Sequence, residues 1–233
     1  MTIYASLPPR HFKDEIFRQF ARIGKALASP KRVELLDVLS QGPRTVEVLA
    51  REAECSVANT SRHLQVLRGA RLVEGDRSGL FVTYRVSDER VSAFLRQFRL
   101  LAESRLAEVN ATTQAFLGER IGFKPVGRRE LLRQVRAGEV TVLDVRPREE
   151  YAAGHLPGAI SVPLDDLRKR LRGIPKDRGI VAYCRGPHCV LSVEAVELLR
   201  RRGYRAQRFD LGVHDWRGLG FEIETVAAGG IAA

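Results

Sequence analysis

Cysteine is scarce in this sequence. The 233 residues include only three, Cys55, Cys184 and Cys189. In a reducing compartment, three cysteines do not form a disulfide framework of the kind that holds small secreted domains together. No apolar run approaches the ~20 residues needed to cross a bilayer, and residues 1–17 lack the basic-then-apolar order of a signal peptide. We therefore expect a cytoplasmic protein without a membrane partner.

Internal repeats and low-complexity tracts are also absent, so both halves of the chain can be globular. Hydrophobic residues make up 44% of the sequence and charged residues 29%, as in ordinary globular domains. The formal net charge of +11 favours an anionic partner, with nucleic acid as the first candidate. The positive excess is divided almost evenly between residues 1–120 and 121–233. Charge alone therefore does not identify which half binds the anion.

The N-terminal half has the periodicity of several short helices. Apolar residues recur at three- and four-residue spacing through residues 11–30, which predicts a first helix. Shorter helices are expected over 31–42, opened by Ser29-Pro30, and over 45–53. A fourth helix should follow its N-cap residue Ser56. Its inward face is predicted to consist of Val57, Thr60, Ser61, Leu64 and Leu67.

A β-hairpin and a long helix should complete this half. Residues 71–87 alternate around a turn at 76–79, and the helix runs from Ser87 or Asp88 to about Gly118. Two short helices, the second followed by a hairpin, form a winged helix-turn-helix. A helical interaction module with a hairpin is the alternative.

The fourth helix is the predicted DNA-recognition element. Such a helix buries one face and inserts the opposite face into the major groove. Asn and Gln side chains can pair with adenine, and Arg can pair with guanine. Thr60 or Ser61 could reach a phosphate, and Arg77 at the hairpin tip would meet the backbone or the minor groove. The predicted DNA-binding residues are Ser56, Asn59, Thr60, Ser61, Arg62, His63, Gln65 and Arg77.

The run SVANTSRHLQVLRGARLVEGDRSGLFVTYRV, residues 56–86, resembles the recognition helix and wing of ArsR-family winged-helix repressors. The resemblance covers about residues 12–117. It implies a homodimer, held by the long first and last helices, that binds a double-stranded DNA operator. Many members sense metals, but the cysteine pair that they carry in the third helix is missing here. The last helix has Asp88 and no histidine, which leaves Cys55, His11 and His63; we expect no metal site.

Residues 118–127, GERIGFKPVG, are the predicted linker, and the pattern of apolar residues changes after them. From residue 128 onward, short apolar strands alternate with helices. This order is typical of a parallel sheet covered by helices on both faces. The chain should therefore contain a winged helix-turn-helix domain over residues 1–117 and an α/β domain over residues 128–233.

Two of the three cysteines lie in one short segment, YCRGPHCVLS, at residues 183–192. Cys184 ends an apolar strand and begins a loop that leads into a helix. The helix N-terminus, Arg185 and His188 should all lower the pKa of a thiol there and favour an anionic ligand. Gly186 and Pro187 suit a tight loop.

Three chemistries fit a nucleophilic cysteine in such a loop. Sulfur transfer would place a persulfide on Cys184. Phosphatase or arsenate-reductase chemistry would need an arginine at position 190, where this chain has Val190; this counts strongly against it. A redox switch would have Cys189 attack an oxidised or persulfidated Cys184.

The run VLDVRPREEYAAGHLPGAISVP, residues 142–163, resembles the signature of rhodaneses, which are sulfurtransferases. The resemblance covers about residues 124–225 and implies that Cys184 is the sulfur-accepting nucleophile. It also implies that Asp144 and Arg146 support the loop, and that the turn is shaped by Glu149, Gly154, His155, Gly158 and Ala159. The cysteine loop is longer than in common single-domain rhodaneses, so the substrate stays open. The predicted catalytic residues are Cys184, Arg185, His188, Cys189, Asp144 and Arg146.

These observations predict a DNA-binding regulator whose rhodanese domain takes up sulfane sulfur, or another thiol-modifying signal, at Cys184. The small-molecule partner would be a sulfur-containing anion such as thiosulfate or polysulfide, and no cofactor is expected. His188 could act as a general base or as a simple cation. The alternative is a thiosulfate or polysulfide sulfurtransferase in which the winged helix serves localisation or dimerisation.

Overall fold

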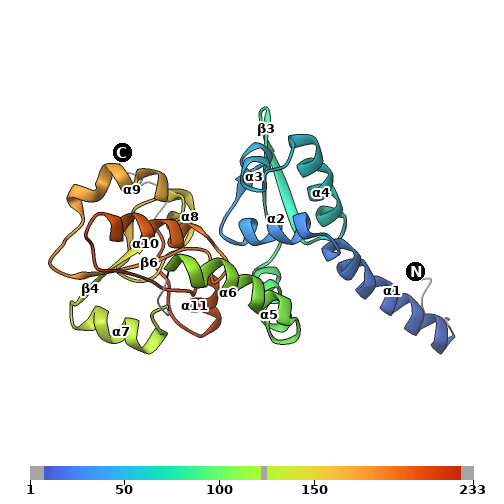
Figure 1. The fold of residues 1–233 in the computed structure, drawn as a ribbon. Helices are drawn as coiled ribbons and strands as arrows, with labels where there is room; N and C mark the ends of the chain where they lie inside the picture. Colours follow the sequence, from blue (N-terminus) through green and yellow to red (C-terminus); the bar gives the residue numbers. More distant parts are fainter. Residues whose placement is uncertain (1–7, 122–124, 227–233) are drawn as a thin grey trace. The chain divides into compact units, whose positions relative to one another are not determined.

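The computed structural model describes residues 8–121 and 125–226 (Figure 1). The chain divides into two compact units, Met1–Leu95 and Arg96–Ala233. This division falls earlier in the sequence than the expected boundary near residue 117. The expected linker, residues 118–127, begins inside a helix, and its residues 122–124 lie outside the described residues.

The first unit is a winged helix-turn-helix. Four helices precede a two-stranded wing, and a short strand before the third helix joins the wing in an antiparallel sheet of order β1-β3-β2. The elements are α1 (Pro9–Leu27), α2 (Pro30–Ser40), β1 (Arg44–Thr45), α3 (Val46–Glu52), α4 (Val57–Gly69), β2 (Val73–Ser78) and β3 (Phe81–Val86).

Local signals in the sequence place the elements of this unit. The Ser56 hydroxyl accepts a hydrogen bond of 3.2 Å from the Asn59 N–H, which confirms Ser56 as the N-cap of α4. The wing turns at Gly79 and Leu80, later than expected, because the strand pairing continues to Ser78 and Phe81. Gly79 has a φ of +60°, a left-handed conformation that favours glycine.

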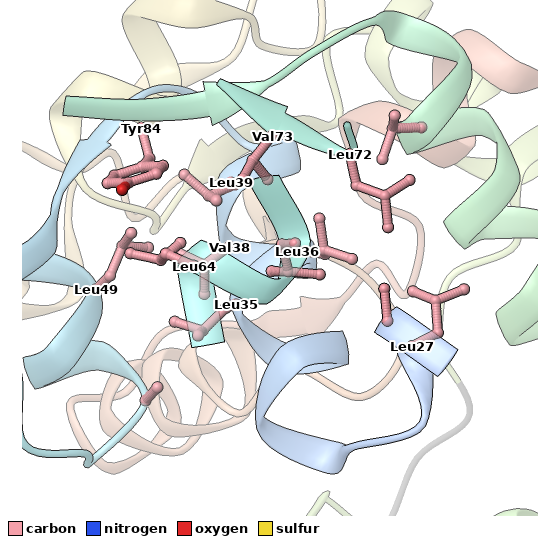
Figure 2. Close-up of a cluster of buried hydrophobic side chains, with 14 of the residues drawn as sticks. Leu27, Leu35, Leu36, Val38, Leu39, Leu49, Leu64, Leu72, Val73 and Tyr84 are labelled. Carbon is pink, nitrogen blue, oxygen red and sulfur yellow. The ribbon is translucent and has the colours of Figure 1, made fainter. Parts of the chain in front are cut away.

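Leucines from several helices form the core of the first unit (Figure 2). Leu35 and Leu36 of α2, Leu49 of α3 and Leu64 of α4 are all fully buried. Tyr84 of the wing closes the same cluster. The core thus fixes α4 through its inner face and leaves its outer face to solvent.

A helix expected to run unbroken to about Gly118 is divided in the structure. It consists of α5 (Glu89–Arg105) and α6 (Ala107–Ile121), separated at Leu106. The side-chain amide of Asn110 donates a hydrogen bond of 3.0 Å to the carbonyl of Glu103. This bond satisfies a carbonyl near the end of α5, where the helical ladder stops. Among the described residues, no helix is long and apolar enough to span a membrane.

The second unit contains the predicted parallel sheet, with strand order β5-β4-β6-β7. Its strands are β4 (Val140–Asp144), β5 (Ile160–Ser161), β6 (Gly179–Tyr183) and β7 (Ala206–Arg208). Its remaining helices are α7 (Arg128–Arg136), α8 (Arg148–Ala153), α9 (Leu164–Arg170), a 3₁₀ turn (Leu171–Gly173), α10 (Leu191–Arg201) and α11 (Val213–Gly218).

Both faces of this sheet are covered. Leu143, Ile180 and Ala182 pack with α9 and α10 on one face, whereas Val142 and Val181 pack with α7 and α11 on the other. Alternate residues of each strand therefore serve opposite cores. Because the strands are parallel, the carboxyl ends of β4 and β6 lie at one edge of the sheet. The loop that leaves β6 at this edge carries Cys184 and Cys189.

Candidate functional site

Cys184 lies at the carboxyl end of β6, where the chain turns toward α10. It is 1% exposed. Its Sγ atom is 3.1 Å from the Ser192 hydroxyl and 3.5 Å from the carbonyl oxygen of Cys189. The side chains of Cys184 and Cys189 are also hydrogen-bonded to each other. Both cysteines are free thiols. The loop thus brings the side chains of two cysteines, five residues apart in the sequence, into contact.

The two thiols have opposite tendencies to ionise. Burial raises the pKa of Cys184, but hydrogen bonds from Cys189, from the Ser192 side chain and from the backbone at Ser192 and Gly186 outweigh burial and lower this pKa to about 6. The hydrogen bond to Cys184, together with burial, raises the pKa of Cys189 above its ordinary value. The loop therefore favours the ionised form of Cys184 and opposes ionisation of Cys189. A lowered pKa is what a nucleophilic cysteine requires.

Ser192 and Arg208 are site residues that the sequence analysis missed. Ser192 is fully buried in the first turn of α10. Arg208, on β7, donates from Nε to the Ser192 hydroxyl at 3.0 Å and from a terminal nitrogen to the Gly186 carbonyl at 3.1 Å. It also donates to the Pro187 carbonyl. A guanidinium from β7 thus binds the cysteine loop. The loop itself has Val190 at the position where phosphatase or arsenate-reductase chemistry would need an arginine.

Arg185 holds the loop by an ion pair with a neighbouring helix. Its guanidinium donates to the Glu150 carboxylate at 2.6 Å, and Glu150 on α8 is fully buried. Glu149, which the resemblance to rhodaneses placed at the turn, is exposed. That prediction is wrong, because the neighbouring residue Glu150 is the carboxylate that points inward.

Asp144 and Arg146 form a second buried ion pair beneath the loop. A terminal nitrogen of Arg146 lies 2.6 Å from an Asp144 oxygen and donates to the Gly154 carbonyl at 2.7 Å. Tyr183, which precedes Cys184, donates its hydroxyl to Asp144. The pair therefore fixes the end of β6 and the turn after α8.

His188 lies at the outer side of the loop, with 41% of its side chain exposed. Its Nε2 is 2.9 Å from a Glu103 oxygen, and its Nδ1 is 3.3 Å from the Thr113 hydroxyl. Glu103 is on α5 and Thr113 on α6. The imidazole thus connects the loop to these two helices through both of its ring nitrogens.

The segment before α11 packs directly against the loop. A Cβ atom on Gly212 would lie 2.1 Å from the Arg185 carbonyl oxygen, so only glycine allows this approach. Asp215, three residues later, accepts from the Gly212 N–H at 3.2 Å and from Arg96 Nε at 3.2 Å, and is also paired with Arg99. The loop is thereby held from both sides by buried contacts.

The residues predicted to contact DNA lie on α4, at its N-cap and on the wing. Thr60 is fully buried, which agrees with its expected inward position and makes the expected phosphate contact by its hydroxyl wrong. Val57, expected to face inward, is 50% exposed, which shows that the buried stripe is rotated slightly around the helix. Ser61 and His63 are half-buried, and the exposed members of the set are Ser56, Asn59, Arg62, Gln65 and Arg77.

Comparisons with known proteins agree with these two architectures. Residues 27–76 match the family model of a helix-turn-helix domain, and residues 128–219 match that of the rhodanese-like domain. The protein is therefore a helix-turn-helix protein joined to a rhodanese-like domain.

The chain is also similar to two curated relatives and to one solved structure. The HTH-type transcriptional regulator Rv0324 of Mycobacterium tuberculosis is 41% identical over 212 residues, which are 91% of this chain and 93% of that protein. A sulfurtransferase of Allochromatium vinosum is 34% identical over 86 residues, 36% of this chain and 78% of its own length. A homodimeric winged-helix domain of Mb0332 from Mycobacterium bovis is 35% identical, with 44% of this chain and 93% of that domain covered and a TM-score of 0.40. The chain belongs to the ArsR-type HTH transcriptional regulators that carry a rhodanese domain.

The hydrogen bond between the two cysteines predicts a pair of contrasting variants. Cys189→Ala removes the donor and should raise the pKa of Cys184 above about 6, because burial then acts with less opposition. Cys189→Ser keeps a donor and should preserve most of the low pKa. The rate of Cys184 modification by a small alkylating reagent, followed by peptide mass against pH, measures this pKa. Equal midpoints in the wild type and Cys189→Ala would contradict the assignment.

Proposed function

We propose that this transcriptional regulator responds to sulfane sulfur, or to another thiol-modifying signal, taken up at Cys184. The observation that carries the proposal is the placement of Cys184 and Cys189 in one loop, where the buried Cys184 sulfur lies 3.1 Å from the Ser192 hydroxyl. The surroundings lower the pKa of Cys184 and raise that of Cys189. A thiolate is the form of cysteine that attacks sulfur, and a neighbouring thiol can resolve the product. The rhodanese-like domain that surrounds the pair supports sulfur as the signal.

The proposed chemistry proceeds in two steps. The Cys184 thiolate attacks the outer sulfur of thiosulfate, the bond between the two sulfurs breaks, sulfite leaves, and Cys184 becomes a persulfide anion; a polysulfide would instead release a shorter polysulfide. Cys189 then attacks the Cys184 sulfur. A disulfide forms, and the outer sulfur leaves as hydrosulfide with the proton of the Cys189 thiol. In the second step, the Cys189 sulfur is oxidised to the disulfide level and the transferred sulfur is reduced to hydrosulfide.

Contacts of the loop with α5 provide a route by which its state could influence DNA binding. His188 of the loop is bonded to Glu103, and Asp215 behind the loop is paired with Arg96 and Arg99. These three partners lie on α5, which begins at Glu89 and contributes Val91 to the core of the first unit. Modification of the loop would favour one arrangement of these contacts over another. Such a differential stability of two states is what coupling between sites requires.

The DNA ligand is proposed to be a double-stranded operator bound by a homodimer. The outer face of α4 presents Asn59, Arg62 and Gln65, side chains suited to base edges in the major groove. Helix α1 exposes Phe12, Phe17 and Phe20, an apolar surface that a second copy of the chain would bury. A two-fold dimer would present two recognition helices to a symmetric site.

A sulfurtransferase enzyme is the second candidate, favoured by the match of the rhodanese-like domain. Turnover distinguishes the two functions. Many turnovers with thiosulfate and an acceptor thiol or cyanide, lost in Cys184→Ala, would support the enzyme. One modification per site would support the sensor.

Polysulfide treatment should change the affinity of the wild-type protein for its operator, and Cys184→Ser should abolish that change. A coupling of typical strength corresponds to about 5–150-fold in affinity, measured by gel-shift titration. Intact-mass analysis follows the modification itself. The mass of one added sulfur indicates a persulfide, and the loss of two hydrogens indicates the disulfide. Identical affinities under all conditions would eliminate the coupling.

Arg62→Ala should weaken operator binding by about 1–3 kcal/mol and relax the preference for one base, as expected of a base-reading arginine. Arg68→Ala removes the same charge from the last turn of α4 and serves as the matched control. Fluorescence anisotropy with operator and single-base variants separates the two effects. If both variants lost affinity equally and kept base preference, Arg62 would be a phosphate contact only.

Glu103→Ala should uncouple sulfur uptake from DNA binding, because it removes the α5 partner of His188. The variant should still gain sulfur at Cys184 while its operator affinity responds less to polysulfide than that of the wild type. Glu108→Ala changes an exposed carboxylate on α6 and is the control. A full response in Glu103→Ala would refute this route through α5.

A further inference from the structure

Arg208 is a buried cation that has no carboxylate partner in the described part of the chain. It is 4% exposed, and its three hydrogen-bond acceptors are neutral: the Ser192 hydroxyl and the carbonyls of Gly186 and Pro187. Among the described residues, no carboxylate oxygen lies within ion-pair distance of it. A buried charge is costly unless a charge of opposite sign is near.

The other buried arginines of the described chain do have such partners. Arg146 lies 2.6 Å from Asp144, and Arg44 lies 3.8 Å from Glu52. Asp210, two residues after Arg208, does not form an ion pair with it; burial raises the pKa of Asp210, and the charge of Arg208 only opposes this rise. The anion that best complements Arg208 is therefore the Cys184 thiolate, which Ser192 connects to it.

The direction of the hydrogen bonds follows from their donors. A guanidinium can only donate, so the Ser192 oxygen accepts from Arg208 Nε at 3.0 Å. The single hydroxyl proton of Ser192 is then free to point to the Cys184 sulfur at 3.1 Å. A hydrogen bond to a charged group is stronger than one between neutral groups. Arg208 thus determines that Ser192 donates to the sulfur.

Arg208 also binds the parts of the loop that would repel an anion. The Gly186 carbonyl lies 3.9 Å from the Cys184 sulfur and is bonded by the guanidinium at 3.1 Å. The same side chain binds the Pro187 carbonyl. The positive charge offsets the negative ends of these two dipoles next to the sulfur.

We propose that Arg208 is a positioning residue for sulfur uptake, which directs the Ser192 hydroxyl to Cys184 and supplies the buried positive charge that stabilises an anionic sulfur there. The anionic sulfur is the thiolate before uptake and the persulfide after it. The inference rests on the proposed function for its purpose, but it concerns the ionisation of one thiol and holds without reference to DNA.

The test is the pH dependence of Cys184 alkylation in the full-length protein, with each modified peptide identified by mass. Ser192→Ala and Arg208→Gln should each move the midpoint upward by about one unit or more, which lowers the rate below the midpoint roughly tenfold. The double variant should shift no further than the larger single shift, because both changes interrupt one chain of hydrogen bonds. Arg208→Lys keeps the charge without the forked donors and should fall between the wild type and Arg208→Gln.

Arg205→Gln is the matched control, since Arg205 is an exposed arginine immediately before β7; its midpoint should equal that of the wild type. The other titratable and charged groups on and around the loop are unchanged in every variant: Cys189, His188 with Glu103, Arg185 with Glu150, Asp210 and Asp215. Circular dichroism verifies that each variant is folded. If Arg208→Gln does not fold, Ser192→Ala and Arg208→Lys decide the question.

Wild-type midpoints in Ser192→Ala and in the folded Arg208 variants would overturn the proposal, and fully additive shifts would overturn the relay. Its failure is separable from that of the proposed function. Shifted midpoints together with an operator affinity indifferent to polysulfide would leave Arg208 in its role and refute the sensor. Unshifted midpoints together with a normal response of operator affinity to polysulfide would refute the role of Arg208 and leave the sensor function standing.

Discussion

The second unit is organised around a buried cysteine, Cys184, whose surroundings favour its ionised form. A charged sulfur that is 1% exposed can persist only where hydrogen bonds and a nearby positive charge replace the water that it has lost. The Cys189 thiol, the Ser192 hydroxyl and backbone groups of the loop provide those hydrogen bonds. Each of these hydrogen bonds forms only if the loop keeps one conformation. The other contacts of the loop stabilise that conformation.

Three separate parts of the fold hold that conformation. Arg185 forms an ion pair with Glu150 on α8, and Arg208 on β7 donates hydrogen bonds to the carbonyls of Gly186 and Pro187. His188 is bonded to α5 and α6. The first two attachments involve buried groups and therefore resist exchange with water, whereas His188 is partly exposed. If the loop rearranges when its sulfur is modified, the attachment that gives way at least cost is the one to α5 and α6.

Much of this architecture was predictable because it depends on short-range patterns. The cap at Ser56 and the alternation of strands and helices after residue 128 follow from spacing alone. The spacing of Cys184 and Cys189 placed them in one loop and allowed their sulfurs to meet, but did not require it. Partners distant in sequence were not predictable. The apolar pattern around Arg208 indicates a buried strand but does not reveal that a guanidinium there reaches Gly186. Small errors in helical phase also matter: Val57, expected to face inward, is exposed, and Glu150 takes the inward place assigned to Glu149.

The asymmetry between the two cysteines also decides the order of events. If both thiols had ordinary pKa values, either could accept sulfur and the other could resolve it. Here one proton is shared unequally: hydrogen bonding lowers the pKa of Cys184 and raises that of Cys189. Under the proposed function, sulfur would therefore arrive at Cys184. Conversion of Cys184 to a persulfide would remove the thiolate that holds the Cys189 proton, so the barrier to ionising Cys189 would fall only after uptake. The same hydrogen bond that favours attack by Cys184 would thus delay attack by Cys189 until a persulfide has formed.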